Sequence, residues 1–118
     1  MLVGAAIVEL HLHGCQSLKQ KRGIVRSIVH RVRNRFNVAV AEVGGQDKWQ
    51  LCQLGLSSTG ADAVLVRRVL DRAVVFVEDL HLAEVVSVDV EVVDLPHHEA
   101  VWEERDEADE DDPEEGPL

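Results

Sequence analysis

Seven basic side chains gathered in one segment are the residues of this chain best suited to bind a ligand. No acid occurs between Glu9 and Glu42, whereas that interval contains Lys19, Lys21, Arg22, Arg26, Arg31, Arg33 and Arg35. On a helix of about 100° per residue, four of them fall within a stripe about 60° wide: Lys19, Arg22, Arg26 and Arg33. Exposed helix faces usually mix charge signs, because like charges at these spacings repel, so an unmixed stripe favours an anionic partner.

The stripe predicts binding to RNA phosphate, and five residues are expected to make the contacts: Lys19, Lys21, Arg22, Arg26 and Arg33. Lys21 borders the apolar core stripe in the first helical turn, outside the basic stripe, and the turn at residues 14–16 with the helix N-terminus could accept one more anion. RNA-recognition sheets stack bases on strand aromatics. The strands expected here carry only Trp49, at an edge, so binding should read the backbone and tolerate any sequence. A merely solvated face and an acidic protein partner are the alternatives.

The two cysteines do not predict an enzyme. Cys15 stands just before an expected helix start, where the helix dipole and Lys19 would favour a thiolate. A phosphatase-like loop, however, needs an arginine after five intervening residues, and position 21 is lysine. An acylphosphatase would need an arginine in the first loop, and residues 13–17 contain none. We therefore expect a half-buried, inert thiol at Cys15, a core thiol at Cys52 and no catalytic residue.

His11 and His13 raise the question of a metal site. Both lie on one face of an expected strand, and Glu9 and Glu91 could approach them. Protein zinc sites use three or four ligands, and no third ligand stands at a recognisable spacing. The sequence therefore predicts neither a metal site nor a cofactor.

Hydrophobic periodicity predicts the six elements that position these residues. Two helices are expected, from a Ser17 cap to about Arg35 and over residues 63–80, and four strands, over residues 2–12, 37–43, 49–57 and 84–93. The first helix should bury one apolar stripe: Leu18, Val25, Ile28, Val29, Val32 and Phe36. The inward faces of the first and last strands should comprise Val8, Leu10, Leu12, Val86, Val88, Val90 and Val92.

Local signals mark the ends of these elements. Gln20 stands at capping-box spacing from Ser17. Residues 44–47 and 58–62 are rich in Gly, Asp, Ser and Thr, which is typical of turns, and the second turn should end in a helix cap.

The element order βαββαβ predicts an α+β, ferredoxin-like sandwich, in which two helices cover one face of a four-stranded antiparallel sheet. The open face should carry polar residues: Glu9, His11, Gln53, Asp89 and Glu91. The central hairpin has Asp47 and Trp49 at its tip, and both are candidates for contact with a partner.

The net charge of −10 conceals an uneven distribution. Residues 94–118 contain twelve acids and one base, whereas residues 1–93 contain ten acids and eleven bases. Pro96 marks a domain boundary, so we expect a domain over residues 1–95 and a tail over residues 96–118. The tail is too charged to bury a core, which predicts a disordered acidic segment. Because it is tethered, it could fold back on the basic helix and compete with phosphate.

Composition also bears on the compartment. The two cysteines form no disulfide or metal pattern. Residues 1–12 lack the basic start and cleavage site of a signal peptide, and no apolar run approaches the roughly 18 residues of a membrane span. We expect a cytoplasmic protein with no membrane partner.

Four stretches resemble one known family: residues 17–22 (SLKQKR), 33–38 (RNRFNV), 41–43 (AEV) and 46–50 (QDKWQ). In this order, over residues 1–93, they are similar to the YlxP-like family of small bacterial proteins, a domain family of unknown function. The resemblance implies a ferredoxin-like fold. It also implies an association with transcription, translation initiation and ribosome maturation, near whose genes family members are often encoded, but that association is not a mechanism. The family has no agreed catalytic residues to assign, and the tail after Leu95 has no counterpart in it.

Together these observations predict a non-enzymatic binding module, first of all a weak, backbone-reading RNA-binding or ribosome-associated factor. The alternative is a protein-interaction or homodimerisation module. It would use the open sheet face or the edges formed by the second and fourth strands, with the basic helix docking an acidic partner.

Overall fold

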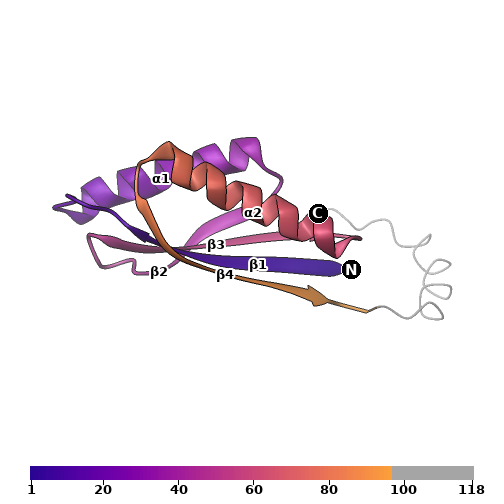
Figure 1. The fold of residues 1–118 in the computed structure, drawn as a ribbon. Coiled ribbons are helices and arrows are strands. Elements are labelled where there is room, and N and C mark those ends of the chain that lie inside the picture. The colour runs from indigo at the N-terminus through magenta and orange to yellow at the C-terminus, as the bar shows by residue number, and fades with distance from the viewer. Residues whose placement is uncertain (97–118) are drawn as a thin grey trace, which may run out of the picture.

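A four-stranded antiparallel sheet positions every other feature of the domain. The computed structural model describes residues 1–96, and the predicted acidic tail lies outside this range apart from its first residue. The elements follow one another as β1 (Leu2–His11), α1 (Leu18–Arg35), β2 (Ala39–Gly44), β3 (Leu51–Gly60), α2 (Ala63–Leu80) and β4 (Glu84–Asp94). The strands lie in the order β2-β3-β1-β4, and both helices cover the same face of the sheet (Figure 1). The predicted ferredoxin-like fold is confirmed.

The core lies between the sheet and the two helices. Residues at alternate positions of β1 and just beyond it, Val8, Leu10 and Leu12, are fully buried, as the period-two pattern predicts. They pack with buried residues of β3, α1 and α2: Leu54, Leu56, Val25, Ile28, Val32, Leu70, Ala73 and Val77. Within residues 1–96, no element covers the face of the sheet that points away from the helices (Figure 1).

Helix α1 begins as predicted. The Ser17 hydroxyl accepts a hydrogen bond from the Gln20 amide at 3.1 Å, and the Gln20 side chain accepts one from the Gln16 amide at 3.0 Å. The first bond satisfies an amide that the first helical turn leaves without a partner, and the second ties down the residue before the cap. Of the predicted apolar stripe, Val25, Ile28 and Val32 are buried, whereas Leu18, Val29 and Phe36 are only partly covered.

One inward residue of β4 was predicted wrongly. Val86 is 54% exposed, and Val85 packs against the core in its place. Val88 keeps its predicted direction, because it pairs with the buried Val8, but it is 38% exposed on this edge strand. The register shifts at Val86, since Glu9 pairs with Ser87 but Leu10 pairs with Val85. Val86 is therefore an extra residue, a β-bulge, and a bulge moves every side chain on one side of it to the opposite face.

The limits of β2 and β3 also differ from the predictions. β2 begins at Ala39 rather than residue 37, and β3 begins at Leu51 and continues to Gly60 through most of the predicted turn. Leu2 pairs with Gly60 and Val3 with Thr59, so the ladder with β1 overrides the turn preference of these small polar residues. The predicted cap remains, because the Asp62 carboxylate accepts a hydrogen bond from the Val64 amide at 2.8 Å.

The uncovered face differs in part from its predicted character. Gln53, Asp89 and Glu91 are exposed there, whereas Glu9 and His11 are partly buried. The centre of the face also carries apolar side chains, of which Ile7 is 48% and Val43 53% exposed.

Two glycines give a matched test of the packing between sheet and helices. A Cβ on Gly4 would lie 2.6 Å from Val66 Cγ1 and 2.8 Å from Leu70 Cδ1, whereas a Cβ on Gly23 of α1 would meet nothing within 4 Å. Gly4→Ala should therefore lower the free energy of unfolding by about 1–3 kcal/mol through overpacking. Gly23→Ala should raise it by about 0.5–1 kcal/mol through helix propensity. Urea unfolding measures both, and equal effects of the same sign would contradict this packing.

Candidate nucleic-acid interface

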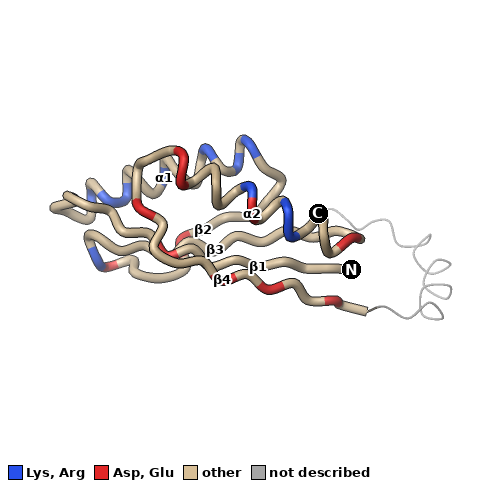
Figure 2. The backbone as a smooth tube through the Cα atoms, in the orientation of Figure 1, with Lys and Arg blue, Asp and Glu red and all other residues tan. Residues whose placement is uncertain are grey.

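The basic stripe of α1 faces solvent. Burial of Val25, Ile28 and Val32 fixes the rotation of the helix against the sheet. The side chains a quarter-turn away are exposed: Lys19, Arg22, Arg26, His30 and Arg33. Arg31 and Arg35, on the other side of the helix, are exposed as well. Figure 2 shows most of the basic residues in the helical layer, whereas β4 carries acidic residues and no basic one. The two faces of the domain thus differ in charge.

Most bases of α1 have no acidic partner. Within residues 1–96 the ion pairs of Lys and Arg side chains are Lys21–Glu42 and Arg67–Asp71, so six of the seven α1 bases are unpaired there. Arg33 donates a hydrogen bond to the Val40 carbonyl at 2.9 Å, which anchors it to β2. The Arg35 guanidinium lies 5.3 Å from the centre of the Phe76 ring. Lys19, Arg22 and Arg26 are the bases of the stripe that no contact within the described part of the chain restrains.

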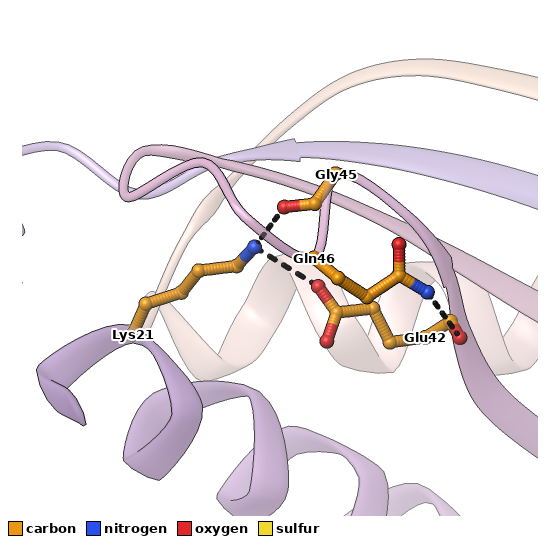
Figure 3. Close-up of polar contacts among 4 residues, drawn as sticks. All are labelled: Lys21, Glu42, Gly45 and Gln46. Carbon is orange, nitrogen blue, oxygen red and sulfur yellow. Dashed lines mark hydrogen bonds and ion pairs between the residues drawn. The ribbon is translucent and has the colours of Figure 1, made fainter. Parts of the chain in front are cut away.

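Lys21 does not belong to this surface. Its side chain is 1% exposed, and its ammonium donates to the Gly45 carbonyl and lies 2.9 Å from the Glu42 carboxylate (Figure 3). The prediction that Lys21 contacts phosphate is therefore wrong, because its charge is already neutralised inside the protein. The sequence did contain a signal for this burial. Lys21 stands four positions before Val25 and continues the three-to-four spacing of the buried stripe.

The ion pair joins α1 to the hairpin between β2 and β3. The Glu42 side chain is only 20% exposed, and apart from the Lys21 ammonium no donor in residues 1–96 reaches its buried oxygen. Gly45 has φ 78°, a left-handed conformation that glycine adopts without strain, and this turns its carbonyl toward Lys21. The side-chain Nε2 of Gln46 donates to the Glu42 backbone carbonyl at 3.5 Å. The hairpin tip is thus held beside the first turn of α1.

The hairpin tip carries the two predicted partner contacts. Asp47 and Trp49 are both exposed, together with the base Lys48 between them. Because Lys21 holds Gly45, these residues lie at the end of the molecule where α1 begins (Figure 2). An exposed indole and a lysine therefore adjoin the N-terminal end of the basic stripe.

Neither cysteine is available as a surface nucleophile. Both are buried, so Cys15 is more enclosed than the half-buried thiol that the sequence predicts. Burial, followed by the nearby Glu42 charge, raises the pKa of Cys52 to about 12, and the Lys21 charge offsets this only in part. The Cys52 thiol is therefore protonated at neutral pH.

The sequence did not predict one further basic cluster. Arg68 and Arg72 of α2 line a groove of about 590 Å³ with Arg35 of α1, and the partly buried rings of Phe36 and Phe76 also line it. Asp71 and Asp79 line the same groove, so its charge is mixed. The i,i+4 spacing of the two α2 arginines was visible in the sequence, but their position beside Arg35 depends on how the helices pack.

Lys21 and Lys19 provide a matched pair of variants. Lys21→Met leaves the Glu42 charge buried and unpaired, which should lower the free energy of unfolding by about 3 kcal/mol. Lys19→Met makes the same exchange on the surface and should change it by less than about 0.5 kcal/mol. Adding Glu42→Gln to Lys21→Met should recover part of the loss, as measured by chemical denaturation. Equal effects of the two single variants would show that the buried pair does not hold the hairpin.

Comparison with known proteins agrees with the sequence resemblance. The family described as "Protein of unknown function (DUF503)" matches residues 3–90. The uncharacterized protein YlxP of Bacillus subtilis (strain 168) is 34% identical over 77 residues, which cover 65% of this chain and 84% of that protein. A de novo designed protein, Foldit4, superposes with a TM-score of 0.48 at 14% identity, over 81% of this chain and all of the design. Among residues 1–96, neither helix is long and apolar enough to cross a membrane.

Proposed function

The chain belongs to the DUF503 family of proteins of unknown function, and we propose that it is a non-enzymatic module that binds the phosphate backbone of RNA through α1. One observation carries this proposal. Lys19, Arg22 and Arg26 are exposed, lie on one face of a helix and have no carboxylate partner within residues 1–96. Lys and Arg side chains in this state contact phosphates and release the counterions condensed on a nucleic acid.

The charge distribution supports one orientation of bound RNA. The edge strand β4 carries four acids: Glu84, Asp89, Glu91 and Asp94. This edge lies at the other end of the strand order from β2, the strand against which α1 packs. RNA is repelled from this edge and attracted to the helical layer, so the field of the whole domain guides the encounter. The binding surface is therefore a helix face, not the sheet face that RNA-recognition sheets use.

The aromatic residues support backbone reading rather than base reading. The rings of Phe36 and Phe76 contact each other edge to face, with their centres 5.5 Å apart, and both side chains are partly buried. They therefore cannot stack several bases. Trp49 is exposed at the hairpin tip and can stack one base at most. Binding should therefore be weak, salt-dependent and tolerant of sequence.

The side chains that could act as nucleophiles support a non-enzymatic role. Cys15 is buried, the Cys52 thiol is protonated, and the Lys21 ammonium is engaged by Glu42 and Gly45. None of these three groups stands free in a polar cleft, which is where catalytic nucleophiles are activated.

The uncovered sheet face favours a second candidate function, homodimerisation. Ile7 pairs with Gly55, whose neighbour across the sheet is Ala41, and Val43 lies against Gly55. These residues form an exposed apolar centre on a face that no helix covers. Apolar patches of this kind commonly mark protein interfaces, and a second copy of the chain would bring the same patch.

Titration with polyuridylate between 50 and 200 mM salt tests RNA binding. If Lys19, Arg22 and Arg26 contact single-stranded phosphate, the slope of log K against log salt should be about −2, a loss of about 20-fold over this range. The double variant Arg22→Glu/Arg26→Glu should abolish binding at 200 mM salt. The matched control Arg67→Glu/Arg68→Glu changes the net charge equally on α2 and should weaken binding much less.

Two results would contradict the RNA proposal. One is the absence of binding at 50 mM salt, and the other is an equal loss in the α1 and α2 double variants. Static light scattering then decides on the second candidate. A dimer that Ile7→Asp converts to a monomer would support homodimerisation, and a monomeric wild-type chain would exclude it at the concentration used.

A further inference from the structure

Three ligand-bearing side chains meet where β1 ends and β4 begins. They are His11, the last residue of β1, His13, two positions later, and Glu84, the first residue of β4. One ligand atom from each lies within 4.8 Å of the other two. The His13 Nε2 and Glu84 Oε1 atoms are 2.6 Å apart, and the centres of the two imidazole rings are 3.9 Å apart.

The β1–β4 ladder supplies the third ligand that the sequence did not show. His11 and Glu84 are direct partners in this antiparallel pairing, although 73 positions separate them. The bulge at Val86 shifts this end of the ladder relative to the pairing of Glu9 with Ser87. Glu84 therefore faces the histidines, whereas Glu91 pairs with Ala5, six positions before His11 along β1. Register across a bulge is a long-range property, so the local spacing of residues could not have predicted it.

The backbone around the cluster is well anchored. Leu12, between the two histidines, is buried, and its amide donates to the Gln50 carbonyl at 2.9 Å. The two imidazoles flank this fixed residue, so their backbone positions are set before any ligand binds. His13 and Glu84 also line an open pocket of about 490 Å³ with Glu78 and His81, at the end of α2. A third imidazole and a second carboxylate thus lie beside the cluster.

We propose that His11, His13 and Glu84 bind one divalent transition-metal ion of the Zn²⁺ type. Two imidazole nitrogens and a carboxylate oxygen form a ligand set that zinc uses in proteins, and magnesium and calcium prefer oxygen ligands alone. With Zn–N bonds of about 2.0 Å, tetrahedral ligand atoms lie about 3.3 Å apart. The His13–Glu84 separation of 2.6 Å is shorter than this value, all three ligand atoms lie within 4.8 Å of one another, and the exposed side chains of His13 (64%) and Glu84 (60%) can rotate to adjust.

The ion replaces the hydrogen bond that now joins His13 to Glu84. Three protein ligands leave a fourth position of a tetrahedral site open to water or to a donor from another molecule. The site ties the end of β1 to the start of β4 and does not depend on RNA binding.

The test is a titration of the metal-free, full-length chain with ZnCl₂, followed by competition with a chromophoric chelator. One ion should bind per chain, and His11→Ala or His13→Ala should weaken binding by more than about tenfold, since loss of an outer-shell partner alone costs that much. Glu84→Gln should weaken it as well. Once zinc saturates the site, two imidazole signals of the proton NMR spectrum should have shifted. They are the signals that are missing from the spectra of the His11→Ala and His13→Ala variants. MgCl₂ should produce no such shift.

Two matched controls remove other imidazoles. His30→Ala takes an exposed imidazole from α1, where it contacts Asn34, and should leave zinc binding unchanged. His97→Ala/His98→Ala removes the two histidines that follow Pro96 and should also leave it unchanged. Absence of stoichiometric zinc binding would overturn the proposal. So would binding that survives in His11→Ala/His13→Ala, or binding that is lost in His97→Ala/His98→Ala.

Discussion

The buried ion pair between Lys21 and Glu42 is the constraint on which the working surface depends. It is the one place where a base of α1 meets an acid within the described residues, and it joins the first turn of the helix to the β2–β3 hairpin. Burying both charges costs solvation free energy, which their mutual attraction and the Gly45 carbonyl offset. Together with the buried apolar stripe, this contact holds α1 in one rotation and at one position along the sheet. Lys19 and Arg22, on either side of Lys21, are thereby turned outward beside the hairpin tip.

The remaining bases of α1 create a tension that the fold resolves by packing. Lys19 and Arg22, and Arg22 and Arg26, stand three and four positions apart, where like charges destabilise a helix by about 0.2–0.5 kcal/mol per pair. The helix forms nonetheless, because Val25, Ile28 and Val32 bury completely against the sheet and contribute more than this repulsion costs. The helix is therefore stable although the positive charge of its exposed face is not neutralised, and this uncompensated charge would attract an anionic partner. The acids of β4, at the far edge of the sheet, leave that face available.

The sequence predicted what local periodicity determines. The alternation through Val8 and Leu10, the helix cap at Ser17 and the exposed stripe of α1 each depend on residues close together in the chain, and the βαββαβ order followed from them. The failures involve contacts between distant segments. Lys21 is a partial exception: its charge favours the surface and its spacing favours the buried stripe, and only its distant partner Glu42 shows how the charge can be buried. The bulge at Val86 and the approach of Glu84 to the two histidines depend on strand register, which no local pattern contains.

The central claim is that RNA contacts the exposed face of α1. An NMR titration of the isotope-labelled chain with a short oligouridylate measures this directly, because each backbone amide reports on its own surroundings. The account predicts that the amide signals that shift belong to Lys19, Arg22 and Arg26 and to the hairpin tip around Trp49, and that the shifts disappear as salt is raised. Shifts confined to the open sheet face, around Ile7, Val43 and Gly55, would contradict it.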